Sequence, residues 1–431
     1  MPEPKYRFET LSLHAGQTAD PCTFSRAVPV YRTSSFVFKN TEHAANLFGL
    51  KEPGNIYTRL MNPTHEVLEK RMAALEGGVG ALVHASGTAA VFNTIINLCQ
   101  NGDEVVAARN LYGGTYTMFD AILPQFGIKV KMVDPAKPEA FKQALTDRTR
   151  AIYVETIGNP TLEITDLEAV SKIAQSAHVP LVVDSTFTTP YLLRPLEYGA
   201  DIVVHSLTKW LGGHGTAIGG VVVDGGKFDW TDKKFKLFNE PEPSYHDLRF
   251  AHDLGDLQPQ AFILRQRLVA MRNLGACLSP DNAWLFLQGL ETLPLRMQRH
   301  CENALAVARF LKQEDQVSWV RYPGLEDDPA HGLAKRYLPR GAGGMVVFGI
   351  KGGALNGQRF IEALQLFSHL ANVGDAKSLA IHPASTTHAQ LSAAQQQEAG
   401  VTPDMIRLSI GLEHVDDLRE DLRQALVRAI V

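Results

Sequence analysis

Cysteine is scarce in this chain, with four residues among 431. The four are Cys22, Cys99, Cys277 and Cys301. No two of them form the C-x-x-C pair of zinc sites and thiol–disulfide catalysts, so we expect neither a bound metal nor a disulfide framework. Their scatter is typical of a protein kept in a reducing compartment.

Long apolar runs and a strong net charge are also missing. The N-terminus, MPEPKYRFETLSLHAG, has no apolar segment of the kind a signal peptide needs, and no stretch approaches the roughly 18 apolar residues of a membrane span. A net charge of −4 gives no electrostatic basis for binding nucleic acid or an anionic membrane. With 45% hydrophobic and 20% charged residues, the composition predicts a globular protein with a large core, which we place in the cytoplasm.

The glycine motifs of nucleotide-binding proteins are absent too. There is no P-loop, G-x-x-x-x-G-K-[ST], and no strand is followed by a helix that opens with G-x-G-x-x-G. The loop HASGTAA, residues 84–90, has a comparable position but lacks the spacing, and GGHGTAIGG, residues 212–220, leads into another strand. A nucleotide-binding fold is therefore not expected.

Between residues 79 and 223, short Val- and Ile-rich runs alternate with amphipathic segments. This alternation predicts an α/β protein with a mostly parallel sheet that helices cover on both faces. Residues 1–65 lack sustained periodicity and are expected to form an extended arm. Residues 66–293 are expected to form a large domain, with a polar and aromatic insertion at about 224–260, and residues 294–431 a smaller α+β domain.

Polar residues stand at or after the ends of several predicted strands, where ligands bind in such sheets. They are Ser86, Tyr112, Glu155, Asp184 and the run Ser206–Lys209. Ser86, Gly87 and Thr88 lie where a strand becomes a helix. Free backbone N–H groups and the helix dipole favour a phosphate there, although the same residues could serve only as a helix cap.

Asp184 and Lys209 end two consecutive predicted strands, so a carboxylate and an amine could face one ligand. Pyridoxal 5′-phosphate (PLP) uses both, because its aldehyde condenses with a lysine and its ring nitrogen pairs with a carboxylate. Ser206 and Thr208 flank the lysine and could supply hydroxyls to the phosphate. Taken singly, the aspartate and the lysine could each be ordinary turn residues.

Six motifs, in order along nearly the whole chain, resemble the Cys/Met-metabolism enzymes among the fold-type I PLP-dependent proteins. They are YTRLMNPT, HASGTAA, ETIGNPT, VVDSTFTTP, VVHSLTKWLGGHG and IRLSIGLE. The resemblance implies an α/β/α sandwich with a smaller α+β C-terminal domain, PLP as cofactor, and a homotetramer built from dimers that share active sites. The alternative is a non-catalytic relative, but the lysine, aspartate and arginine that such a protein could lose are all present.

The resemblance also implies residue roles. Lys209 matches the Schiff-base lysine, which shuttles protons, and Asp184 the partner of the ring nitrogen. The phosphate cradle matches Ser86, Gly87, Thr88, Ser206 and Thr208. Tyr112 matches the ring that stacks on the cofactor, whereas Tyr57 and Arg59 match residues that reach the phosphate of the neighbouring subunit.

Substrate contacts follow from the same resemblance. Arg407 matches the arginine that binds the substrate α-carboxylate through a planar fork. Asn159 and Ser378 match positions near the cofactor oxygen and that carboxylate. Glu155 shares the same strand end and could either line the site or lie just behind it.

Three features favour the O-acetylhomoserine sulfhydrylases within this family. Gly114 stands where methionine γ-lyases have a characteristic cysteine. Lys377 stands where cystathionine enzymes usually have a glutamate; it would repel the ammonium of a second amino acid and tolerate hydrosulfide. The insertion near 224–260 resembles one in the sulfhydrylases.

We therefore predict γ-replacement on O-acetyl-L-homoserine by sulfide, giving L-homocysteine and acetate for methionine biosynthesis. The alternatives are reactions of the cystathionine γ-synthase or methionine γ-lyase type. The acyl group (acetyl or succinyl) and the sulfur donor (sulfide, methanethiol or a thiocarboxylated carrier protein) stay open. His205 and His214 bracket Lys209, but no third residue has the spacing of a metal ligand.

Overall fold

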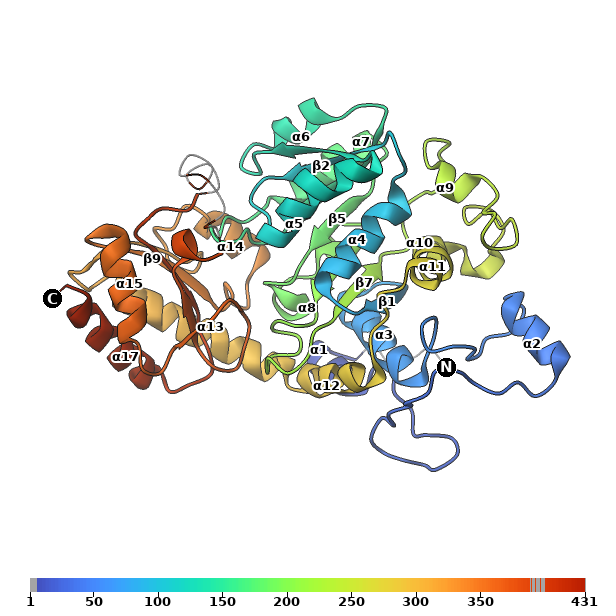
Figure 1. The fold of residues 1–431 in the computed structure, drawn as a ribbon, viewed down its shortest axis with the longest axis horizontal. Coiled ribbons are helices and arrows are strands. Elements are labelled where there is room, and N and C mark those ends of the chain that lie inside the picture. The colour runs from blue at the N-terminus through green and yellow to red at the C-terminus, as the bar shows by residue number, and fades with distance from the viewer. Residues whose placement is uncertain (1–5, 388, 390–391, 393–395, 397–399, 431) are drawn as a thin grey trace.

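Seven strands form one sheet in the order β1-β7-β6-β5-β4-β2-β3 in the computed structural model, which describes residues 6–387, 389, 392, 396 and 400–430 (Figure 1). They are β1 (Gly80–His84), β2 (Glu104–Ala108), β3 (Lys129–Val133), β4 (Thr149–Glu155), β5 (Leu181–Asp184), β6 (Ile202–Ser206) and β7 (Gly220–Asp224). All neighbours pair in parallel except β7, which runs antiparallel to β1 and β6. The predicted mostly parallel sheet is confirmed.

Helices connect these strands and cover the sheet. They are α3 (Pro63–Glu76), α4 (Gly87–Leu98), α5 (Gly113–Thr117), α6 (Pro138–Ala144), α7 (Leu167–Ser176), α8 (Thr189–Leu192), α9 (Lys236–Asn239), α10 (Ala261–Arg265), α11 (Arg272–Leu274) and α12 (Pro280–Glu291). Every residue of β2 and β7 is buried, whichever face its side chain points to. Both faces of the sheet are therefore covered, as a parallel sheet requires.

A second sheet organises the C-terminal part, in the order β10-β11-β12-β9-β8. Its strands are β8 (Val317–Arg321), β9 (Met345–Ile350), β10 (Ser368–His369), β11 (Leu379–Ile381) and β12 (Met405–Ser409), with helices α13 (Leu293–Leu311), α14 (His331–Tyr337), α15 (Gly353–Ala363) and α17 (Val415–Ala429). This part has a hydrophobic core of its own, to which α13, α15 and α17 contribute. Figure 1 shows α13 running from the large unit into the smaller α+β unit.

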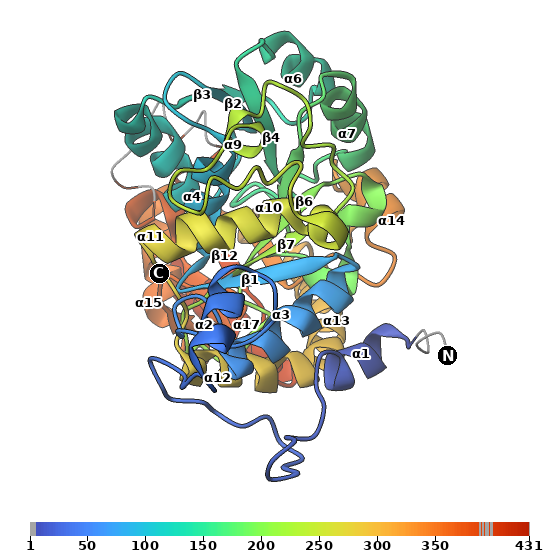
Figure 2. The same cartoon turned by 90° about the vertical axis from the view of Figure 1, so that its right-hand side faces the viewer.

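The sequence predicts an extended N-terminal arm, but the arm is not extended throughout. It contains α1 (Phe8–His14) and α2 (Thr41–Phe48). Helix α1 packs on the body with Phe8 buried, whereas the chain between the helices runs outward (Figure 2), where Val37 is 97% exposed. Helices of seven or eight residues span about two turns, too few for an apolar period to stand out in the sequence.

The insertion at 224–260 forms an aromatic cluster beside α9. Trp230 stacks on Phe238 with ring centroids 4.3 Å apart, and Phe235 meets Trp230 edge-on at 5.4 Å. Tyr245 donates a hydrogen bond to the Phe48 carbonyl, which ties the insertion to the arm. The aromatic residues of the insertion thus extend the core.

No helix within the described ranges is long and apolar enough to cross a membrane.

Candidate active site

A cleft of about 970 Å³ lies at the carboxyl ends of the parallel strands. Eleven predicted residues line it: Ser86, Gly87, Thr88, Tyr112, Glu155, Asn159, Asp184, Ser206, Thr208, Lys209 and Arg407. Strands β4, β5 and β6 end at Glu155, Asp184 and Ser206, so the shared strand edge brings these three together.

One end of the cleft is shaped to receive an anion. Ser86 caps α4, its Oγ accepting from the Ala89 N–H at 3.0 Å. A Cβ on Gly87 would lie 2.8 Å from the Ser206 Cβ, so glycine lets the helix start approach β6 closely. The Thr208 hydroxyl accepts from Gly219 N–H at 3.1 Å on the same side. Free N–H groups, hydroxyls and the helix dipole together suit a phosphate.

Asp184 lies on the cleft floor, where hydrogen bonds hold its carboxylate. Its Oδ1 accepts from the Thr186 N–H at 2.9 Å, and the Thr186 hydroxyl in turn accepts from the Ser206 N–H at 2.9 Å. Thr186 therefore joins the carboxylate to the phosphate end. Sequence reasoning missed it, although its place two residues after a strand-end aspartate was a usable signal.

Lys209 follows β6 and its side chain is largely buried. Burial, and then the charge of Arg407, lower the pKa of its amine to about 8. The amine donates a hydrogen bond to Oδ1 of Asn372, a loop residue of the smaller unit that also lines the cleft. Sequence reasoning missed Asn372 as well, because an asparagine in a distant loop carries no signal of its own.

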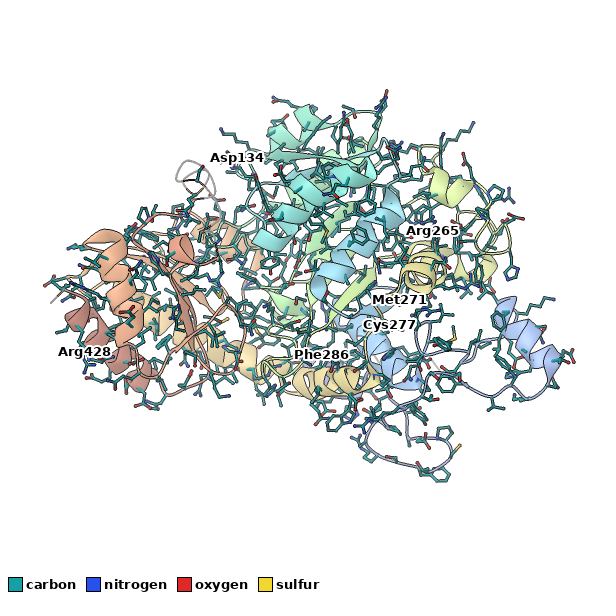
Figure 3. The ribbon with its side chains drawn as sticks, viewed as in Figure 1. Asp134, Arg265, Met271, Cys277, Phe286 and Arg428 are labelled. Carbon is teal, nitrogen blue, oxygen red and sulfur yellow. The ribbon has the colours of Figure 1, made fainter. Side chains whose placement is uncertain are left out.

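A glycine-rich backbone behind Lys209 packs against α12 and α13. Added Cβ atoms on Gly212 and Gly219 would lie 3.0 and 2.4 Å from the ring of Phe286, a residue of α12 (Figure 3). Buried Arg296 donates to the Trp210 carbonyl at 2.7 Å and the Gly289 carbonyl at 2.6 Å. The glycines thus allow helix packing that fixes the segment after the lysine.

Arg407 comes from β12 and reaches the cleft from the smaller unit. Its Nη1 donates to Oδ1 of Asn159 at 2.9 Å, whereas its buried Nε has no hydrogen-bond partner among the described residues. Burial lowers the pKa of the guanidinium to about 10, so it stays charged at neutral pH. A buried cationic group with a free donor is suited to an anion such as a carboxylate.

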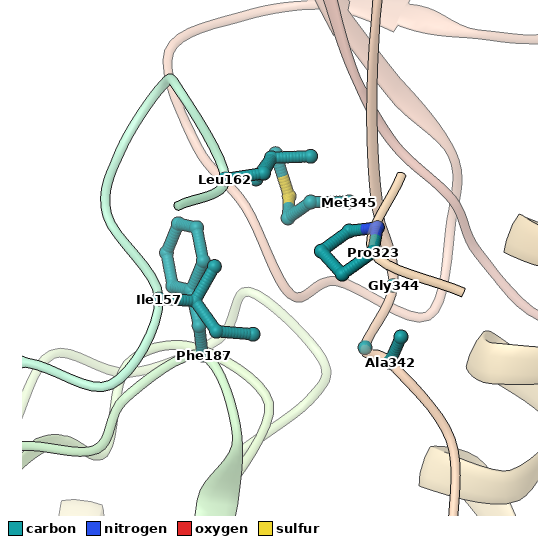
Figure 4. A pocket seen from close by; sticks show the side chains of 8 residues that line it. Ile157, Leu162, Phe187, Pro323, Ala342, Gly344 and Met345 are labelled. Carbon is teal, nitrogen blue, oxygen red and sulfur yellow. The ribbon is translucent and has the colours of Figure 1, made fainter. Parts of the chain in front are cut away.

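The junction beside Arg407 is apolar. Ile157 and Phe187 line the cleft and also a smaller crevice, whose other walls include Pro323 and Met345 of the smaller unit (Figure 4). Apolar contact at this crevice holds the smaller unit, with Arg407 and Asn372, over the strand ends.

Tyr112 stands at the cleft wall, just before α5. The residue is 50% exposed, and its ring folds back over Gly114, where an added Cβ would lie 2.6 Å from the tyrosine Cε1. Glycine at position 114 therefore makes room for the observed orientation of this ring.

Four predicted residues do not line the cleft. The Ser378 hydroxyl donates to Glu413 at 2.9 Å and accepts from the Gly411 N–H at 2.8 Å, and Lys377 is exposed. The structure thus gives no support to substrate contacts by these two. Tyr57 and Arg59 lie exposed on the arm, with the guanidinium 5.1 Å from the tyrosine ring centroid.

The residues of the cleft fit PLP. Lys209 offers an amine of lowered pKa, Asp184 a half-buried carboxylate, and the start of α4, held close to β6 by Gly87, a phosphate cradle. Tyr112 offers a ring, and Arg407 keeps a donor free for a second anion. Fold and cleft together define a PLP-dependent enzyme of fold-type I.

Comparison with known proteins gives the family. Residues 9–427 match the Cys/Met metabolism PLP-dependent enzyme model, so the chain belongs to this family. It is 57% identical to the O-acetyl-L-homoserine sulfhydrylase of Leptospira meyeri, covering 98% of this chain and 97% of that one. It is 50% identical to the homocysteine synthase of Schizosaccharomyces pombe, covering 99% of both.

A solved structure agrees in fold. A putative O-acetylhomoserine (thiol)-lyase from Campylobacter jejuni superimposes with a TM-score of 0.94 at 42% identity, covering 98% of this chain and all of that one. That protein carries a pyridoxyl-lysine monophosphate at its own position 205.

Proposed function

We propose that this enzyme catalyses γ-replacement, converting O-acetyl-L-homoserine and sulfide into L-homocysteine and acetate in methionine biosynthesis. The observation that carries the proposal is full-length identity of 50–57% to curated sulfhydrylases and a homocysteine synthase, in a chain with a complete PLP cleft.

The cleft residues divide the work. Bound PLP supplies an electron sink that acidifies the C–H bonds next to the substrate amino group. Arg407 holds the substrate carboxylate, and Asn159 fixes the guanidinium from the other side. Lys209, whose amine has a pKa of about 8, can accept and return a proton near neutral pH. Asn372 is placed to hold that amine when it is free.

The choice of sulfur nucleophile rests on the relatives. Lys377, which the sequence suggested as a filter against a second amino acid, is exposed and does not line the cleft. Gly114, which stands in place of the cysteine of methionine γ-lyases, still disfavours the lyase reaction. The ring of Tyr112 also occupies the space that a side chain at position 114 would need. Sulfide is the proposed donor, with methanethiol and a sulfur-carrier protein as alternatives.

A shared active site is part of the proposal. The arm leaves Phe24 79% and Val37 97% exposed, apolar side chains that a second copy of the chain would cover. We propose that the arm packs on a second copy, where Tyr57 and Arg59 reach the phosphate end of its cleft, and that two such dimers form a tetramer. We also propose a cytoplasmic location.

Side-by-side steady-state kinetics test the reaction. Purified protein is assayed with O-acetyl- and O-succinyl-homoserine, each with sulfide, cysteine or methanethiol. The proposal expects homocysteine from the acetyl ester and sulfide with the highest kcat/KM. Cystathionine from cysteine without homocysteine from sulfide would instead identify a cystathionine synthase.

A further inference from the structure

Two carboxyl groups lie side by side on the cleft floor. Glu155 ends β4 and Asp184 ends β5, and the two strands pair these residues directly. Glu155 is only 6% exposed. The cations of the cleft point elsewhere, since Lys209 donates to Asn372 and Arg407 to Asn159.

The two carboxyls have unequal surroundings. Asp184 accepts hydrogen bonds from the Thr186 N–H at 2.9 Å and the Tyr153 hydroxyl at 3.4 Å, and it feels the charge of His205. These contacts favour its ionised form. Glu155 accepts the Tyr112 N–H at 2.7 Å, and no cation acts on it among the described residues.

Two carboxyls that share one site do not readily ionise together, so one of them keeps a proton. Burial, and then the charge of Asp184, raise the pKa of Glu155 well above its ordinary value. Burial raises the pKa of Asp184 too, but its hydrogen bonds oppose that change. The proton therefore belongs on Glu155.

We propose that Glu155 is a positioning residue that works as a neutral carboxylic acid. One oxygen of Glu155 accepts a hydrogen bond from the backbone N–H of Tyr112. Because Glu155 keeps the proton, Asp184 is the ionised carboxyl that faces the ring nitrogen of PLP. The inference rests on the cofactor of the family and is independent of the proposed acyl-homoserine substrate.

Substitutions separate a neutral acid from a carboxylate. Glu155→Gln reproduces the neutral acid, with an oxygen for the Tyr112 N–H and a donor in place of the O–H. Glu155→Leu removes the acceptor and leaves that N–H unpaired. Glu155→Asp keeps a carboxyl that is one methylene too short to reach Tyr112. Glu139→Gln, at an exposed position of α6, is the matched control.

Two measurements need no substrate: the Kd of PLP for the apoenzyme, and the pH midpoint of the visible absorbance of the holoenzyme. We expect Glu155→Gln to keep the Kd within about 3-fold and the midpoint within about 0.3 pH units. Glu155→Leu and Glu155→Asp should each raise the Kd by roughly 10-fold, as expected for an unpaired buried N–H.

Three outcomes would overturn the inference. A midpoint shift of about one unit in Glu155→Gln would mean that a negative charge had been lost beside the ring. An unchanged Kd in Glu155→Leu would remove the positioning role. Glu155→Asp binding PLP better than Glu155→Gln would show that charge, rather than reach, matters; this comparison decides the case even if Glu155→Leu fails to fold.

Discussion

At Gly114, an added Cβ would lie 2.6 Å from Cε1 of Tyr112, whereas nothing lies within 4 Å of a Cβ added at Gly113. Both residues open α5, so they share the same helix start. The ring of Tyr112, which we propose stacks on PLP, therefore depends on a missing side chain two residues further along the chain. Side chains at 113 and 114 should have very different effects on the enzyme.

We predict that Gly114→Cys displaces the Tyr112 ring and lowers kcat/KM by roughly 10-fold or more, because small misplacements near the reacting atoms are costly. Gly113→Ala is the matched control and should stay within about 3-fold of the parent enzyme. Equal losses in the two variants would show that the first turn of α5, and not the tyrosine ring, is the sensitive element.

The lowered pKa of Lys209 predicts the pH dependence of cofactor uptake. Only the neutral amine attacks the PLP aldehyde. With a pKa of about 8, about a tenth of the amine is neutral at pH 7 and nearly all of it above pH 9. The uptake rate of the apoenzyme, followed by visible absorbance, should rise with pH and level off above about pH 9. A rate that still rises past pH 10 would mean an unshifted lysine.

Among the elements, the segment after β6 depends most on distant support. Arg296 of α13 donates to the carbonyls of Trp210, Leu211 and Gly289, and it is 6% exposed. These bonds fix the backbone directly behind Lys209 to two helices. Losing these hydrogen bonds should therefore affect both the stability of the protein and the cofactor site.

We predict that Arg296→Leu lowers the free energy of unfolding by roughly 2–5 kcal/mol, because it leaves three carbonyls without their donor. Urea unfolding of the holoenzyme measures the change. Arg296→Lys keeps the charge and part of the bonding, so it should lose less. A free energy within about 0.5 kcal/mol of the parent for Arg296→Leu would contradict this account of the segment.

How far the sequence predicts the site also depends on its elements. Ser86, Asp184 and Lys209 could be found because parallel strands end at one edge, and the motifs around them match a family. Asn372 could not, since a loop of the second unit brings it to the cleft. Lys377 and Ser378 follow cleft-lining Val373 by four and five residues, yet Lys377 is exposed to solvent and Ser378 bonds to Glu413.

The sequence likewise predicts some elements of the fold and not others. Alternating apolar runs predict the strands of the large sheet, because burial on both faces demands continuous hydrophobicity. The two arm helices were missed because they are short and lightly buried. The sequence predicts a polar and aromatic insertion, but not that Trp230, Phe235 and Phe238 are buried together. Composition cannot show which residues of a mixed segment meet.

For the whole molecule, the proposed sharing of active sites has a numerical consequence. A cleft would use Lys209 from one chain and Arg59 from the other. Lys209→Ala and Arg59→Ala proteins should each be weak or inactive alone. After joint refolding in equal amounts, about half of the dimers are mixed, and each mixed dimer has one intact site, so about a quarter of the parent activity should return.

Recovery on mixing requires the intact residues to meet across the interface. No gain over the separate variants would place both residues in the same chain's site, or leave Arg59 outside it. Size-exclusion chromatography with light scattering on the same samples would show whether the dimers pair into tetramers.

The central claim is that the amine of Lys209 holds PLP in the cleft at the strand ends. Borohydride reduction of the holoenzyme fixes the cofactor to the amine it occupies, and peptide mass spectrometry then locates it. The account predicts a pyridoxyl group on the peptide that contains Lys209, and none in the Lys209→Ala protein. A pyridoxyl group on another lysine, with Lys209 unmodified, would contradict it.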